Sequence, residues 1–161
     1  MPEEARDRSA LAQKSFERLA EVCGDITAPV LETYYREHPG ARQSFVDHGL
    51  GETAKLEGRM VAESLFLLLT WTENQSAARI DHGSAIVHHN DTMRIPPHWY
   101  LGMVDAVLEV LLGTLPAEAD DERDMWREVR SEFARFVQSL REEFVRSDGG
   151  APLPAFPVAK M

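Results

Sequence analysis

The sequence predicts an all-α protein with a single domain of about seven helices. Apolar residues recur at helical spacing along most of the chain, and no stretch shows the strict alternation of a half-buried β-strand. The length of 161 residues suffices for one domain with a substantial core. We therefore expect one domain over residues 1–145, followed by a tail over residues 146–161 whose Gly, Pro and Ala content favours disorder.

Composition and charge narrow the class of partner. The formal charge of −10 disfavours nucleic acid, whose phosphates require clustered Lys and Arg. The longest apolar run, Leu65 to Thr70, is too short to cross a bilayer, so no membrane partner is expected. The single cysteine, Cys23, rules out an intramolecular disulfide and a cysteine zinc site. Because the N-terminus is acidic, unlike a secretory signal, we expect a cytoplasmic protein.

Three helices are predicted in the first half of the chain. The first, Ser9 to Cys23, precedes Asp25, which is placed to cap a second helix from Ile26 to His38. A loop with two glycines follows at Asp47–Gly51. A long helix then runs from Glu52 to Trp71, with its leucines gathered on one face.

The second half begins with a polar linker, Thr72–Ala77, and a weaker helical segment that ends at His89. Ile95-Pro96-Pro97 then starts a strongly apolar helix, because proline fits the first helical turn and cannot continue a helix. Asp120-Asp121 suits the N-terminus of the last helix. That helix carries the clearest 3.6-residue stripe in the chain, formed by Trp126, Val129, Phe133, Phe136, Val137, Leu140 and Phe144.

Paired histidines, His88 and His89, precede the Ile95-Pro-Pro corner. A histidine held in the last turn of a helix can reach a metal with a neutral ring nitrogen, although a surface or hydrogen-bonded histidine is the commoner case. Phe45 is either a core aromatic at a corner or part of a binding site. Glu57 lies one turn before Val61 on the long helix, so its carboxylate either approaches the apolar side or turns outward to water.

Three separate stretches share their spacing with one known family. Phe45 follows a proline by six positions, at the corner after the second helix. Glu57 is followed four positions later by Val61 on the long helix. His89 is followed six positions later by Ile95 and then by a proline. In these three places the chain resembles the globins, and bacterial single-domain globins in particular.

The resemblance covers residues 9–144 and implies a globin-like fold around haem b. It implies that His89 ligates the iron and that its other ring nitrogen donates to the carbonyl of Ala85. His88 is the rival ligand, but choosing it would break the spacing to Ile95. The resemblance further implies a haem-pocket lining formed by Phe45, Glu57, Val61, Leu31, Ile95 and Trp99. The four remaining histidines, at corners or loops, are most simply surface residues: His38, His48, His82 and His98.

The distal positions depart from the oxygen-binding relatives. Many of these place His or Gln where this chain has Glu57, and an ionised carboxylate cannot donate a hydrogen bond to bound oxygen. The position of the distal tyrosine of flavohaemoglobins matches Leu31, although Tyr34 lies one turn away. We therefore expect weak stabilisation of bound oxygen.

The resemblance thus implies a haem-binding globin whose iron binds a diatomic ligand, namely oxygen, nitric oxide or carbon monoxide. Its implied role is transport or gas sensing, and we expect that it is not primarily an enzyme. Two alternatives stay open. One is a haem-free, globin-like signalling or interaction module. The other is a nitric oxide dioxygenase or peroxidase that takes electrons from a separate reductase. Apolar stripes on the last two helices favour either a homodimer or a larger core.

Overall fold

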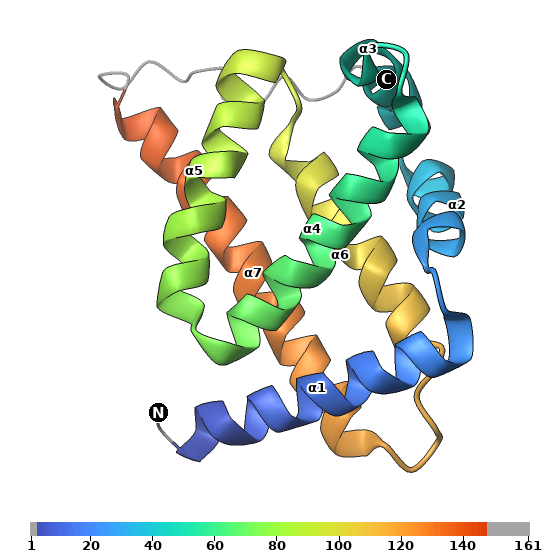
Figure 1. Cartoon of the computed structure of the whole chain (residues 1–161). Coiled ribbons are helices and arrows are strands. Elements are labelled where there is room, and N and C mark those ends of the chain that lie inside the picture. The colour runs from blue at the N-terminus through green and yellow to red at the C-terminus, as the bar shows by residue number, and fades with distance from the viewer. Residues whose placement is uncertain (1–2, 148–161) are drawn as a thin grey trace.

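The computed structural model describes residues 3–147, and within that range it contains α-helices and no strand (Figure 1). The all-α prediction is confirmed, and the seven helices of the described range are consistent with a globin-like fold. They are α1 (Glu3–Cys23), α2 (Thr27–Glu37), α3 (Ala41–Gly49), α4 (Thr53–Glu73), α5 (Gln75–Met93), α6 (Pro97–Leu112) and α7 (Asp120–Ser147).

Two predicted connections are wrong. The loop expected at Asp47–Gly51 begins inside α3, and the linker expected at Thr72–Ala77 shrinks to the single residue Asn74 between α4 and α5. The side chain of Asn74 accepts a hydrogen bond from the backbone N–H of Ala77 at 3.1 Å, so α5 begins immediately after α4. The polar residues expected to form a linker are instead the end of α4 and the capped start of α5.

The predicted tail is described only at its beginning. Helix α7 continues through Ser147, two residues beyond the expected end of the domain at residue 145. Residues 148–161 lie outside the described part of the chain.

Helix α4 crosses the middle of the molecule, where it contacts α1, α2, α3, α5, α6 and α7 (Figure 1). Its C-terminal half enters the core with Trp71, which is 1% exposed and lies edge-on to Phe133 of α7 at 5.4 Å between ring centroids. Helix α5 lies alongside α4 and against α6 and α7. This arrangement leaves the N-terminal half of α4 facing α5.

A buried acid joins the first and last helices. Glu122 of α7 is 2% exposed, and its carboxylate accepts hydrogen bonds from both terminal nitrogens of Arg18, at 2.6 and 2.9 Å. Ser15 also donates to it, at 2.6 Å, and in turn accepts a hydrogen bond from the indole of Trp126 at 3.0 Å. The hydrogen bonds from Arg18 are the main cause that lowers the pKa of Glu122 below its ordinary value.

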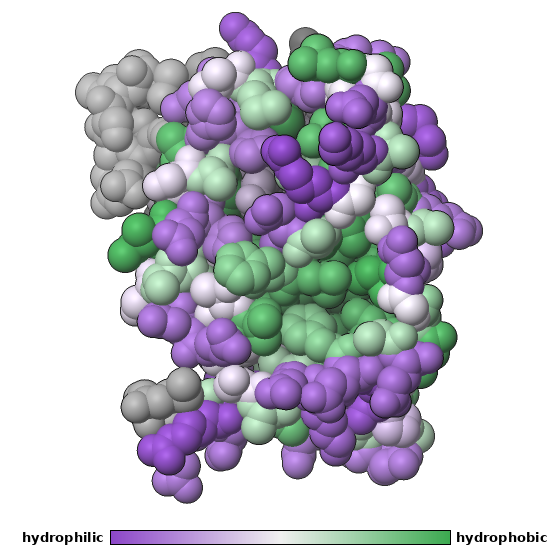
Figure 2. Space-filling view, viewed as in Figure 1, coloured by the Kyte–Doolittle hydropathy of each residue, from purple (hydrophilic) through white to green (hydrophobic). Residues whose placement is uncertain are grey.

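The surface is mixed in character on the face that Figure 2 shows. An apolar hollow lies between α4 and α1, and polar side chains gather above it toward α5 (Figure 2). Phe66 of α4 is 57% exposed and borders this apolar hollow. No helix in the described range is long and apolar enough to cross a membrane.

The Arg18–Glu122 contact predicts a pH-dependent stability. Glu122→Gln should lower the free energy of unfolding by about 3 kcal/mol near neutral pH, because Arg18 would keep its charge in a largely buried position without a carboxylate. The folded pKa of Glu122 is lowered, so its contribution is complete above the unfolded value of about 4.3 and is lost as pH falls through the folded pKa. Wild type and variant should therefore converge in acid.

Denaturant unfolding at neutral and at acid pH measures this convergence. Asp124→Asn is the matched control, since its ion pair with Arg127 is exposed and should contribute little at either pH. A loss in Glu122→Gln no larger than in Asp124→Asn would contradict the account.

Candidate functional site

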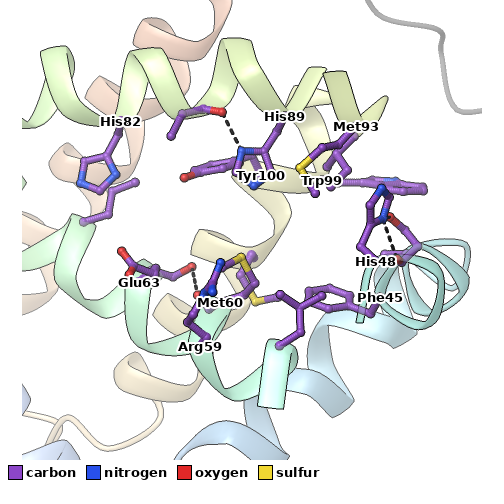
Figure 3. Close-up of a pocket in the computed structure, with 18 of the residues that line it drawn as sticks. Phe45, His48, Arg59, Met60, Glu63, His82, His89, Met93, Trp99 and Tyr100 are labelled. Carbon is purple, nitrogen blue, oxygen red and sulfur yellow. Dashed lines mark hydrogen bonds between the residues drawn. The ribbon is translucent and has the colours of Figure 1, made fainter. Parts of the chain in front are cut away.

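A cavity lies between α4 and α5 and is also lined by residues of α2, α3 and α6 (Figure 3). Its volume is about 690 Å³, within the range of small-molecule and cofactor sites. Most of the lining is apolar or aromatic, with a few polar groups. The α5 wall of the cavity carries Asp81, His82, Ala85, His88, His89 and Met93.

His89 is held in one orientation by its own helix. Its Nδ1 lies 2.6 Å from the carbonyl oxygen of Ala85, one turn earlier, as the resemblance implies. A carbonyl oxygen can only accept, so Nδ1 carries a proton, and in the neutral ring the lone pair is on Nε2. Because His89 lines the cavity, Nε2 of the neutral ring is the nitrogen that could bind a metal.

The end of α5 secures the backbone of His89. Helix α5 continues one turn past His89 to Met93, further than the sequence predicts, and Arg94 then adopts a left-handed conformation with φ of 54°. This turn brings the N–H of Ile95 to the carbonyl of His89 at 3.0 Å, which satisfies one of the free carbonyls at the helix end. The corner after α5 is therefore hydrogen-bonded directly to the backbone of His89.

Helix α6 begins at this corner, as predicted, with Pro97 in its first turn. The corner and the first turns bring Ile95, Trp99 and Tyr100 to the cavity. The ring of Tyr100 lies at 5.6 Å from that of His89 in an edge-on arrangement and helps to fix the imidazole plane (Figure 3).

Five of the predicted site residues come together at the cavity. Phe45 of α3 lines it and lies edge-on to Tyr34, while Ile95 and Trp99 line it from the corner and from α6. His89 and His88 both reach it from α5. His88 is exposed, and its Nδ1 lies 3.4 Å from the hydroxyl of Thr92, so it occupies the rim.

Three predicted residues lie elsewhere. Glu57 accepts a hydrogen bond from the hydroxyl of Tyr35 at 2.8 Å and, with Val61 and Leu31, is absent from the cavity lining. Val61 is 2% exposed in the core. One residue along a helix turns the side chain by about 100°, so a small difference in the rotation of α4 changes which residues face α5. The inward positions of α4 are Leu56, Met60, Ser64 and Leu67.

Tyr34 lines the cavity, but its hydroxyl donates to the carbonyl oxygen of Trp99 at 3.1 Å. Burial raises its pKa, so the hydroxyl stays protonated. Ser64 of α4 likewise donates to a backbone carbonyl, that of Met60, at 2.9 Å. The hydroxyls of Tyr34 and Ser64 therefore both use their protons within the protein.

Two histidines that the sequence placed at the surface line the cavity instead. His82 is 7% exposed, and its Nε2 has no hydrogen-bond partner in the described structure. Burial lowers its pKa, which favours the neutral ring. His82 precedes His89 by seven residues, or two helical turns, and residues at this spacing lie on the same face of a helix. That spacing could have predicted that His82 faces the cavity as His89 does. His48 lines the cavity from α3, and His98 is exposed as predicted.

A second buried donor without a partner faces the same space. The indole Nε1 of Trp99 has no hydrogen-bond partner in the described structure, although Trp99 lines the cavity. Figure 3 shows Trp99 beside His48 at one end of the cavity and His82 at the other. Buried polar groups normally have partners, so these two nitrogens indicate that the cavity accepts a molecule with polar groups.

Exposed charged side chains stand at the rim of the cavity: Arg59 and Glu63 on α4 and Asp81 on α5. Among the residues that the structure describes, no group of three or more His, Cys, Asp or Glu side chains could hold a bare metal ion. Comparisons with known proteins return no match: no protein-family model fits the chain, no curated protein matches its sequence, and no solved structure matches its fold.

The rotation of α4 can be tested by removing the carboxylate of Glu57 in one variant and by introducing a carboxylate at Leu56 in another. If the cavity binds haem, as the resemblance implies, Glu57→Gln should leave uptake of added haem and its absorption spectrum unchanged, because Glu57 contacts Tyr35 and not the cavity. Leu56→Glu, one position earlier, should impair haem uptake because it places a carboxylate in the apolar cavity. Absorption titration compares both variants with wild type, and a spectrum that changes only in Glu57→Gln would contradict this placement.

Proposed function

We propose that this protein belongs to the globins, binds haem b in the cavity between α4 and α5 through His89, and takes up a diatomic ligand on the α4 side. The observation that carries the proposal is the hydrogen bond from His89 Nδ1 to Ala85, which leaves the Nε2 lone pair for iron. A cavity with such an imidazole on its α5 wall suits haem because the porphyrin supplies the equatorial nitrogens.

The residues around the cavity fit the group. A flat apolar disc requires aromatic or aliphatic side chains on its faces, and Phe45, Ile95 and Leu67 supply them. The edge of haem also carries carboxylates, and the unpartnered nitrogen at either end of the cavity, that of Trp99 or that of His82, is suited to hydrogen-bond with them. Arg59, at the rim, adds a positive charge that favours the same edge.

The bound iron would supply the coordination position for the gas, and the chain's own residues supply its surroundings. His89 gives the proximal nitrogen and Tyr100 packs against its ring. The inward residues of α4 keep water from that position because they are mostly hydrocarbon. Electrons for the iron would come from a separate reductase, and the proposed role is reversible gas binding, in transport or in sensing.

Substitution of the ligand tests the proposal. His89→Ala should abolish stoichiometric haem uptake and its sharp Soret absorption band, because it removes the only inward imidazole whose second nitrogen is already engaged with Ala85. His88→Ala, the matched neighbour, should bind haem as wild type does, since His88 stands at the rim. Absorption titration with haem measures both variants. Failure of wild type to bind, or loss only in His88→Ala, would contradict the proposal.

Bound oxygen should dissociate quickly, because the hydroxyls of Tyr34 and Ser64 donate to backbone carbonyls and not to a ligand. Tyr34→Phe should therefore leave the oxygen dissociation rate nearly unchanged, while the lost hydrogen bond to Trp99 costs about 1 kcal/mol of stability. Stopped-flow displacement of oxygen by carbon monoxide gives the rate. A slowly dissociating oxygen complex that becomes fast in Tyr34→Phe would show that Tyr34 donates to the ligand.

A further inference from the structure

We infer that Met60 binds the haem iron opposite His89, so that the resting protein holds its iron between a histidine and a methionine of its own chain. This inference rests on the proposed haem site and assigns its sixth ligand. The chain's own thioether would then occupy the position that a gas has to enter.

The first observation that supports this inference is the position of Met60. It lies on α4, is partly buried and lines the cavity. Figure 3 shows Met60 on the α4 side of the cavity and His89 on the α5 side. Because Nδ1 of His89 is engaged with Ala85, the free Nε2 is the nitrogen that can bind iron. Met60 and His89 thus approach the same space from facing helices.

The second observation is which donor atoms the inward residues of α4 offer. Leu56 and Leu67 offer hydrocarbon only, and the hydroxyl of Ser64 donates to the backbone carbonyl of Met60. Among the described residues on the inward side of this wall, Met60 alone presents a soft donor atom. A thioether paired with histidine is a known axial set for haem iron. Methionine is also long and unbranched, so its sulfur adapts to the distance required.

The other candidate ligands fail on placement. His82 and His88 stand on α5, the same helix as His89, and ligands on one wall cannot take opposite axial positions. His82 is also displaced from His89 by about 10 Å along the helix axis. His48 has the same kind of Nδ1 contact as His89, with the carbonyl of Ser44 at 2.8 Å, but it stands on α3 at the end of the cavity, beside Phe45 (Figure 3).

Internal ligation has two measurable consequences. A gas must displace the thioether. Its apparent affinity is therefore its intrinsic affinity multiplied by the fraction of molecules in which the sixth position is open. If Met60 occupies that position in about nine molecules of ten, removing it tightens apparent binding about tenfold. A methionine ligand also raises the reduction potential of the iron, so its removal should lower the potential.

The experiment compares wild type, Met60→Leu and Met93→Leu, each loaded with haem and reduced without oxygen. Met93→Leu is the matched control, because Met93 lines the same cavity but stands on the α5 side. Leucine preserves the approximate volume at both positions. Carbon monoxide titration and a potentiometric titration give the affinity and the potential. We expect tighter binding by about tenfold or more, and a lower potential, only in Met60→Leu.

A measurement on wild type does not depend on any variant folding. With methyl-labelled methionine, NMR of the reduced haem protein should show one methionine methyl signal shifted far upfield by the porphyrin ring current. Loss of that signal in Met60→Leu and its retention in Met93→Leu would assign it. If wild type binds haem through His89 without such a signal, or if Met93→Leu removes it, the assignment of Met60 is wrong while the haem site stands. If wild type takes up no haem, both proposals fail.

Discussion

The hydrogen bond between His89 and the carbonyl of Ala85 determines what the cavity can bind. Without it, the imidazole could rotate or take either tautomer, and its ring would be one more polar group against an apolar wall. With it, the protonated nitrogen faces the helix and the basic nitrogen is free. The left-handed turn at Arg94 and the N–H of Ile95 then fix the backbone of the same residue. Local geometry thus fixes the orientation of this imidazole at the cavity wall.

The rotation of α4 determines the opposite wall. Helix α4 is held by the core around Trp71 and by its contacts with the neighbouring helices, so its rotation is set far from the cavity. That rotation directs Glu57 toward Tyr35 and Met60 toward α5. An acid at the inward position would have made the wall polar, whereas the wall observed is apolar with one thioether. The chemistry of the site therefore follows from packing in the core.

Much of the fold was predictable from the sequence because apolar periodicity and proline corners report directly on helices. The stripe of α7 and the Pro96-Pro97 start of α6 are examples. The short α3 was missed because its nine residues carry little apolar periodicity and end in glycine. The break between α4 and α5 was overestimated because one capping side chain, Asn74, replaces a linker.

The candidate site was predictable where it depends on local sequence and not where it depends on tertiary rotation. His89 and its contact with Ala85 lie within one helical turn, and the resemblance to globins implied both. The inward face of α4 depends on how the whole helix is rotated, which explains why Glu57 and Val61 were expected where Met60 and Ser64 lie. His82 was assigned to the surface because it was expected at a corner or loop, whereas it lies within α5, and burial among neighbouring helices cannot be seen in a single segment.

The most direct test of the haem site is a crystal structure of the protein grown with haem, with anomalous diffraction recorded at the iron absorption edge. The account predicts one strong iron peak between α4 and α5, within bonding distance of the Nε2 of His89. An iron peak at His88 or His82, or crystals of the haem-treated protein without iron in this cavity, would contradict it.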